Sequence, residues 1–261
     1  MTEQPYRFND GAVYERLMGV WSRSVGEIFL DWLAPPSGLR WIDIGCGNGA
    51  FTELIVERCA PAAIDSVDPS EGQLAFARTR PAARVATFRQ GDAMALPFAD
   101  ASFDSAVMAL VIFFVPQPAR GVAEMARVTK PGGLVSAYAW DVVGGGLPFQ
   151  PIIAEMRAMG MTPPLPPSFE ASRIEALRDL WKGAGFEDVE TREIVVRRTF
   201  EDFDDYWATD MLANIGKAVA AMPPADAERL KAQVRARVPA DATGRIIHTA
   251  HANAIKGRVP K

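Results

Sequence analysis

Cysteine and histidine are scarce in this chain of 261 residues, which contains two of each. The cysteines, Cys46 and Cys59, are too few for a disulfide framework and lie in apolar sequence, so we expect reduced thiols and a cytoplasmic location. The histidines, His248 and His251, lie three positions apart in a segment that we predict to be a strand, which places them on opposite faces. We therefore expect neither histidine to be catalytic.

Long apolar runs, basic clusters and a secretion signal are also missing. The longest apolar stretch, 106–115, is well short of the about 20 residues that a membrane-spanning helix needs. The net charge is -4, and no basic run offers a face for nucleic acid. The N-terminus lacks the basic segment and apolar run of a signal peptide. These absences favour a small-molecule partner over a membrane or nucleic acid, with the chain as a monomer or homodimer.

Short apolar strands alternate with helical segments between residues 39 and 140. Repeated strand–helix units imply right-handed crossovers and an α/β fold with a doubly wound, mostly parallel sheet. The predicted strands are Leu39–Ile44, Ile64–Asp68, Val85–Arg89, Phe103–Leu110 and Leu134–Trp140. The predicted helices are Ala50–Cys59, Glu71–Arg80, for which Ser70 is the N-cap, and Pro118–Val128.

The rest of the chain is expected to complete one domain over residues 1–261, with a core at 38–141. An N-terminal helical lid is predicted at 10–34. Cap insertions are predicted at about 142–173, which includes a four-proline loop at 161–168, and at about 201–243, which is mostly helical and broken at Pro223-Pro224. Two late strands, Val189–Thr199 and a last strand at about 245–256, would flank the second insertion.

The most informative segment is Asp43–Gly49 (DIGCGNG), where a buried strand runs into a glycine-rich turn and then a helix. Glycine allows positive φ and lets the backbone approach a ligand closely. Amide groups at the start of the helix can face that ligand. The same string fits the dinucleotide pattern G-x-G-x-x-G/A, so an NAD-dependent oxidoreductase and a tight turn without a ligand both remain open on this segment alone.

Two acidic residues follow the next two predicted strands. Asp68, in the run Asp68-Pro69-Ser70, could accept hydrogen bonds from ribose hydroxyls, or could simply cap a helix. Asp92, in the run Asp92-Ala93-Met94, could accept a hydrogen bond from an adenine amino group while its apolar neighbours stack on the ring. An ordinary Gly-Asp turn at Gly91 is the alternative.

Together these motifs resemble those of class I S-adenosylmethionine-dependent methyltransferases, and most closely the methyltransferase type 11 group, which includes the quinone-biosynthesis C-methyltransferases. The segments Leu96–Asp104 and Arg127–Gly133 are similar to the stretches before the fourth and fifth strands of that family. The resemblance implies a Rossmann-like sheet of seven strands with an antiparallel final hairpin. It also implies S-adenosylmethionine as cofactor, S-adenosylhomocysteine as product and a small-molecule methyl acceptor.

The resemblance also assigns a cofactor site. Asp43 would lie near the methionine amino group, and Arg23 or Ser22 would meet the methionine carboxylate. The implied cofactor-binding residues are Asp43, Gly45, Cys46, Gly47, Asn48, Gly49, Asp68, Pro69, Ser70, Asp92, Ala93, Met94, Leu110 and Arg23. A nicotinamide site has no role for Asp43 or for the Asp92 motif, which disfavours the oxidoreductase. A catalytically silent S-adenosylmethionine-binding module stays open as a further alternative.

The N-terminal segment places Tyr14, Met18 and Trp21 on one helical face. In similar enzymes such a helix closes over the cofactor, so these residues are predicted to form part of a lid; a plain packing face is the alternative.

Acceptor-pocket residues are predicted at the carboxyl ends of the fourth and fifth strands, where α/β crevices bind ligands. The candidates are Met18, Trp21, Val111, Phe113, Phe114 and Trp140. Methyl transfer releases a neutral thioether and needs no acid, so positioning in a dry pocket can supply much of the catalysis. Tyr14 and Asp141 are the candidate catalytic groups. Val189–Thr199 lacks the Asp-Asn pair of the metal-dependent branch of the family, so we expect no metal.

Overall fold

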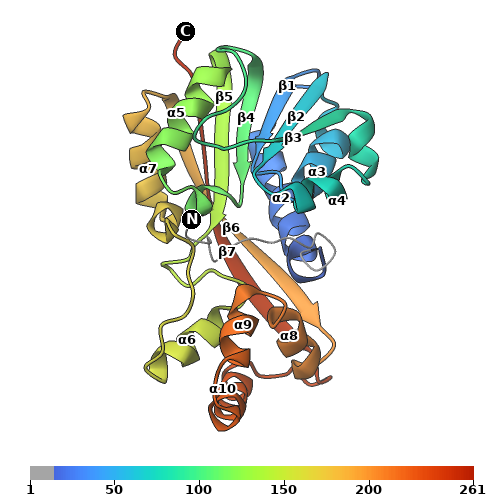
Figure 1. Ribbon diagram of the computed structural model, residues 1–261, viewed down its shortest axis with the longest axis vertical. Coiled ribbons are helices and arrows are strands. Elements are labelled where there is room, and N and C mark those ends of the chain that lie inside the picture. Colours follow the sequence, from blue (N-terminus) through green and yellow to red (C-terminus); the bar gives the residue numbers. More distant parts are fainter. Residues whose placement is uncertain (1–14) are drawn as a thin grey trace.

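The computed structural model describes residues 15–261, and a seven-stranded sheet runs through its centre (Figure 1). The strand order is β3-β2-β1-β4-β5-β7-β6. Strands β1 to β5 pair in parallel, and β7 runs antiparallel to both β5 and β6. The strands are β1 (Arg40–Ile44), β2 (Ala63–Asp68), β3 (Ala86–Gln90), β4 (Phe103–Ala109), β5 (Thr129–Trp140), β6 (Glu187–Phe200) and β7 (Ile246–Arg258). The predicted fold class, including the antiparallel final hairpin, is confirmed.

Helices cover both faces of this sheet (Figure 1). On one face α2 packs against α3, with α4 beside them, and on the other α5 packs against α7. The bounds are α2 (Val20–Leu33), α3 (Ala50–Cys59), α4 (Glu71–Ala77), α5 (Pro118–Val128) and α7 (Ile174–Gly183). Because helices lie on both sides, the central strands are buried and mostly apolar: Trp41 and Ile42 of β1 and Val107 and Met108 of β4 have no exposed surface.

Two predicted elements of the core differ from the structure by three residues or more at one end. The predicted helix Glu71–Arg80 ends at Ala77, because Pro81 follows and forces Arg80 into an extended conformation (ψ 153°). Strand β5 begins at Thr129 rather than Leu134. Thr129 pairs with Phe103, and Pro131–Gly133, which we placed before the fifth strand, lies at an irregularity in the ladder, where a proline is tolerated.

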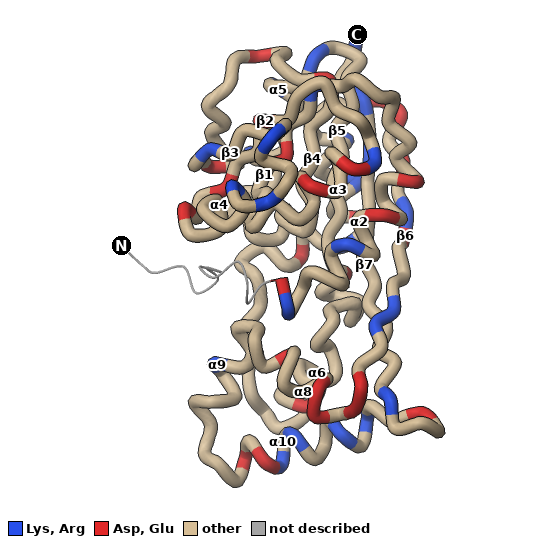
Figure 2. Tube along the Cα trace, turned by 90° about the vertical axis from the view of Figure 1, so that its right-hand side faces the viewer, with Lys and Arg blue, Asp and Glu red and all other residues tan. Residues whose placement is uncertain are grey.

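The late segments form a second lobe that we call the helical cap: α6 (Gln150–Ala158), α8 (Phe203–Asp210), α9 (Asn214–Ala220) and α10 (Pro224–Arg237). The hairpin of β6 and β7 extends from the sheet into this cap (Figure 1). Buried Leu230 and Val234 of α10 face the interior, and Arg237 pairs with the buried Glu155 of α6. Figure 2 shows residues of both charge signs along α10.

Among the helices of residues 15–261, none is both long enough and apolar enough to span a lipid bilayer.

Candidate cofactor and acceptor site

The loop after β1 depends on glycine for two different reasons. Gly45, Gly47 and Gly49 all have positive φ, at 76°, 53° and 79°. A Cβ on Gly45 would lie 2.5 Å from both Cγ atoms of Val111, so no larger residue fits there. A Cβ on Gly47 would meet nothing within 4 Å, so only its backbone conformation favours glycine. The backbone at Gly47 therefore faces open space.

Asp68 ties this loop to the end of β2. Its Oδ2 accepts the Gly47 N–H at 2.9 Å, and its Oδ1 accepts the Ser70 N–H at 2.8 Å. The side chain of Ser70 caps α4 through the N–H of Gln73 at 3.4 Å, as predicted. Burial raises the pKa of Asp68, and the two N–H bonds oppose that rise. Each carboxylate oxygen keeps a lone pair that can accept a hydroxyl of a ligand.

Asn48 of the glycine-rich loop is hydrogen-bonded to Glu15 of the N-terminal segment and to Arg80. Its Nδ2 donates to Oε2 of Glu15 at 2.9 Å, and its backbone carbonyl accepts Nε of Arg80 at 2.7 Å. Arg80 also pairs with Glu15 and, at 2.7 Å, with Glu53 of α3. These contacts fix the start of the described N-terminal segment against the glycine-rich loop.

A cavity of about 870 Å³ opens at the carboxyl ends of the parallel strands, large enough for a nucleotide-sized ligand. The structure brings most of the predicted cofactor residues together in its wall. Those residues are Gly45, Cys46, Gly47, Asn48, Asp68, Pro69, Ser70, Asp92, Ala93, Met94 and Leu110, and the predicted acceptor residues Val111 and Phe114 join them.

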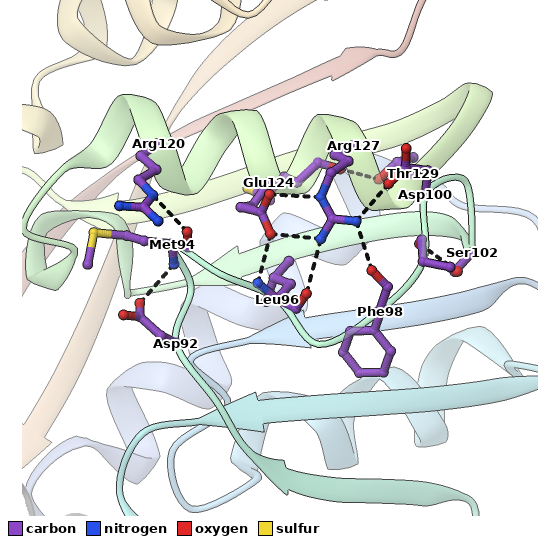
Figure 3. Close-up of polar contacts among 12 residues, drawn as sticks. Asp92, Met94, Leu96, Phe98, Asp100, Ser102, Arg120, Glu124, Arg127 and Thr129 are labelled. Atoms are coloured by element: carbon purple, nitrogen blue, oxygen red, sulfur yellow. Dashed lines mark hydrogen bonds and ion pairs between the residues drawn. The ribbon is translucent and has the colours of Figure 1, made fainter.

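The segment with Asp92 is shaped by its own hydrogen bonds and by α5. Oδ1 of Asp92 accepts the Met94 N–H at 2.8 Å, and Nε of Arg120 donates to the Met94 carbonyl at 2.9 Å (Figure 3). The carboxylate of Asp92 and the side chain of Met94 thus stand in one turn at the cavity wall.

Arg127 of α5 holds the segment that follows Met94 through hydrogen bonds and ion pairs (Figure 3). Its guanidinium donates to the backbone carbonyls of Leu96 and Phe98 at 3.0 and 2.8 Å. It also pairs with Asp100 and, through two nitrogens, with both oxygens of Glu124, all at 2.8 Å. This fork-like donor geometry is specific to arginine, so Arg127 positions the whole loop between β3 and β4.

Asp43 lies beneath the loop rather than in the cavity wall. Its side chain has no exposed surface, and its Oδ2 accepts the Thr52 hydroxyl at 2.6 Å. Its Oδ1 has no hydrogen-bond partner among the described residues. Burial raises the pKa of Asp43 to about 7, the Thr52 hydrogen bond opposes the rise, and the charge of Asp68 adds to it.

Several predicted site residues lie away from this cavity. Arg23 does not line this cavity, and its half-exposed guanidinium pairs with Glu57 at 2.8 Å and Glu27 at 3.2 Å; its contact with a methionine carboxylate stays a prediction. Ser22, which we weighed beside it, does line the large cavity. Gly49 instead packs against α4, where a Cβ would lie 3.0 Å from that of Ala77.

The residues predicted for the lid and for catalysis lie in different surroundings. Trp21 is wholly buried and packs edge-on against Trp140, so it belongs to the core rather than to a cavity wall. Oδ1 of Asp141 accepts the Gly144 N–H at 2.8 Å and closes the turn after β5, and Asp141 does not line the large cavity; its catalytic role stays a prediction. Tyr14 lies outside the described residues.

A smaller cavity of about 60 Å³ adjoins the large one. Leu110 and Phe114 line both. The smaller cavity brings together the predicted acceptor residues Met18, Phe113, Phe114 and Trp140 with residues of the cap and of the four-proline loop. Its lining residues are Leu17, Met18, Leu110, Phe113, Phe114, Trp140, Leu147, Phe149, Pro164, Pro166, Ala213, Asn214 and Ile215.

Sequence reasoning missed some polar residues of these walls. Gln73, Gln90 and Tyr138 line the large cavity, and Asn214 lines the small one. Gln73 lies one turn into a predicted helix beside Ser70, so its position was available from the sequence. Asn214 has no such signal, because it comes from a cap helix with no recognisable motif.

His248 is enclosed by aromatic rings and lines neither cavity. The ring centroids of Trp21 and Tyr206 lie 6.1 and 5.6 Å from it. Burial lowers the pKa of His248 to about 4, and a hydrogen bond to the backbone of Pro148 opposes that shift. Residues 15–261 also contain no group of three or more His, Cys, Asp or Glu side chains placed to hold a metal ion.

The chain is similar to known methyltransferases in sequence and in structure. Residues 42–137 match the family model described as a methyltransferase domain. The chain is 31% identical over 208 residues to 2-methyl-6-phytyl-1,4-hydroquinone methyltransferase 2 of Oryza sativa subsp. japonica, a match covering 72% of this chain and 51% of that protein. It is 35% identical over 138 residues to malonyl-[acyl-carrier protein] O-methyltransferase of Erwinia pyrifoliae, covering 48% and 51%.

A solved structure of Haemonchus contortus phosphoethanolamine N-methyltransferase 2, in complex with S-adenosyl-L-methionine, superposes with a TM-score of 0.58 at 19% identity, covering 96% of this chain and 56% of that one. This likeness supports the fold. The chain spans about half the length of the two curated relatives. Taken with the strand order and the glycine-rich loop, the match over residues 42–137 identifies a class I methyltransferase domain in this chain.

Proposed function

We propose that the protein transfers a methyl group from S-adenosylmethionine to a small-molecule acceptor. The observation that carries this proposal is the convergence of three separate loops on one cavity. The glycine-rich loop after β1, Asp68 after β2 and the Asp92 turn after β3 all line the same space of about 870 Å³. Each follows a parallel strand at the edge where α/β folds bind ligands.

The residues of this cavity fit the proposed cofactor. The open backbone at Gly47 leaves room for the methionine portion, Asp68 has lone pairs for ribose hydroxyls, and Asp92 with Met94 offers an acceptor and an apolar surface to adenine. When bound, S-adenosylmethionine supplies a methyl group activated on a sulfonium. The chain would hold the two reactants in line and keep water away from them.

The small cavity would take the apolar end of the acceptor, because its volume of about 60 Å³ is too small for a whole ring-sized molecule. The described residues that line it include no ionisable side chain, so they offer no general base for the nucleophile. Enclosure and orientation by apolar side chains are therefore the catalytic contribution that we assign to them.

The cellular compartment, the kind of partner and the oligomeric state are proposed as well. Both cysteines are buried as free thiols, which suits a reducing compartment such as the cytoplasm. The mixed charges of the surface favour a small molecule over nucleic acid as partner, and we expect a monomer or homodimer.

Calorimetric titration with S-adenosylmethionine tests the cofactor, using Gly47→Ala beside Gly38→Ala. Both glycines have positive φ, at 53° and 78°, and an added Cβ meets nothing within 4 Å at either position, so each variant places an alanine at positive φ without a clash. Only Gly47 lines the cavity, so only its variant should lose binding. If wild type does not bind, or if both variants bind like wild type, the proposed site is wrong, and NAD would be titrated next.

Product formation tests the activity. Release of S-adenosylhomocysteine in the presence of an acceptor is expected from wild type and not from Gly47→Ala. Tight cofactor binding without turnover on any acceptor would favour the silent binding module instead.

A further inference from the structure

The four-proline loop, residues 161–168, forms part of the wall of both cavities. Pro164 and Pro166 line the small cavity. Leu165 and Pro167, which alternate with them along the chain, line the large cavity. The loop therefore presents one side to each cavity and forms part of the wall between them.

The backbone of this loop is restrained by its composition and by its C-terminal end. Proline fixes φ and has no N–H, so the four prolines leave the loop few conformations. At the end of the loop, the Ser168 N–H donates to the Phe113 carbonyl at 3.0 Å, and the Ser168 hydroxyl donates to the Val115 carbonyl at 2.8 Å. These bonds tie the loop to both chain neighbours of Phe114, which lines both cavities.

The small cavity is narrow and has an apolar wall. Its volume of about 60 Å³ has room for roughly four to six water-sized groups, at about 10–15 Å³ each, so a ring-sized molecule does not fit. None of the described residues that line it has an ionisable side chain, and the side-chain N–H atoms of Trp140 and Asn214 have almost no accessible surface. A thin hydrocarbon chain suits this space, whereas a charged group would be buried there without a partner.

We propose that the methyl acceptor carries an unbranched aliphatic chain, that about four to six of its carbons occupy the small cavity, and that the four-proline loop helps to set this limit. This inference rests on the proposed function, because it names the substrate class of the same site. Leu110 and Phe114 line both cavities, so the chain would pass them while the reacting end stays in the large cavity beside the cofactor. Each methylene buried in the small cavity strengthens binding, so the cavity selects acceptors by chain length.

The test measures the Kd of n-alkyl esters of 4-hydroxybenzoic acid, from methyl to octyl, by NMR titration in the presence of S-adenosylhomocysteine. The aromatic ring is too large for the small cavity, so only the alkyl chain can enter it. In wild type each added methylene should lower Kd about threefold until the cavity is full, near the pentyl ester, and longer chains should gain nothing. Non-specific adsorption would instead strengthen all the way to the octyl ester. The branched tert-butyl ester should bind more weakly than the n-butyl ester.

Two pairs of variants locate the limit. Pro166→Ala and Pro167→Ala both remove a proline ring from the loop, but Pro166 lines the small cavity and Pro167 lines the large one. Leu147→Ala and Leu230→Ala both truncate a buried leucine and leave the loop intact, but only Leu147 lines the small cavity. Pro166→Ala and Leu147→Ala should move the break in the series to a longer ester, and the two controls should keep it where wild type has it.

The proposal is overturned if no ester binds, if the affinity of wild type rises without a break to the octyl ester, or if the break falls at the same chain length in the two members of each pair. Parallel titration with S-adenosylmethionine separates this inference from the proposed function. Normal cofactor binding without a break in the ester series would refute only the substrate class. A break that follows the wall variants in a protein that does not bind S-adenosylmethionine would refute the methyltransferase function and retain the chain-binding site.

Discussion

The enclosed carboxyl group of Asp43 should make the fold less stable as pH rises. The side chain has no exposed surface and only one of its oxygens is hydrogen-bonded among the described residues. Burial raises its pKa from 3.8 to about 7, against the opposing hydrogen bond from Thr52. The folded chain therefore keeps the proton in a pH range where the unfolded chain has already released it.

The size of the effect follows from linkage. A change in pKa from 3.8 to about 7 corresponds to about 4 kcal/mol, at 1.36 kcal/mol for each pH unit. Between those two pH values the unfolded state binds fewer protons than the folded state, so the free energy of unfolding falls. The stabilising contribution is complete below pH 3.8, declines as pH rises towards 7, and is constant above it.

Urea unfolding of wild type and Asp43→Asn between pH 4.5 and 8 measures this contribution. The other titrating groups cancel in the difference between the two proteins, so the stability of wild type relative to the variant should decline by several kcal/mol. Thr52→Ser is the control: it keeps the hydroxyl donor and should keep the pH slope while lowering stability overall. A wild-type-minus-variant difference that stays flat over this range would refute the reasoning.

Three other outcomes are expected. Arg127→Leu removes the contacts that hold the loop between β3 and β4, so it should lower the free energy of unfolding by about 1–3 kcal/mol and weaken cofactor binding. The control Arg229→Leu removes an exposed ion pair with Asp226 within one helix turn, and should change the free energy of unfolding by less than about 1 kcal/mol. Gly45→Ala should lower the free energy of unfolding by roughly 2 kcal/mol or more and abolish cofactor binding, because the new Cβ would lie 2.5 Å from the Val111 methyl groups. Adding Val111→Ala should restore part of the lost stability. The imidazole NMR signals of His248 should not titrate between pH 6 and 8, since burial lowers its pKa to about 4; a midpoint near 6.5 would contradict its burial.

The sequence predicted the central sheet well because each strand there is a local pattern. Mostly apolar runs such as Phe103–Ala109 are covered on both faces by helices, so their composition indicates parallel strands. The bounds of α3 and α5 were predicted to the residue, since glycine precedes the first and proline begins the second. The end of α4 was missed because the effect of Pro81 on Arg80 was overlooked.

The side chains of the site were harder to predict, because motif position does not fix direction. Asp43 sits in the most recognisable motif of the chain, yet its carboxylate turns beneath the loop to Thr52. Arg23 follows a predicted lid face, yet it reaches Glu57 on the next helix. Both outcomes depend on partners from other elements, and a single sequence does not reveal which partner is nearest.

The walls of the two cavities come from different parts of the chain, and this difference affects which substrate can bind. The wall of the large cavity comes mainly from strand ends within residues 42–137, the part that matches the methyltransferase domain. The small cavity draws Met18, Pro164 and Asn214 from three segments outside that range. Changes in those segments can alter the acceptor without disturbing the sheet or the cofactor loops. Relatives that share the core can therefore act on different molecules, and the residues of these three segments are a better guide to the acceptor than overall identity to any one relative.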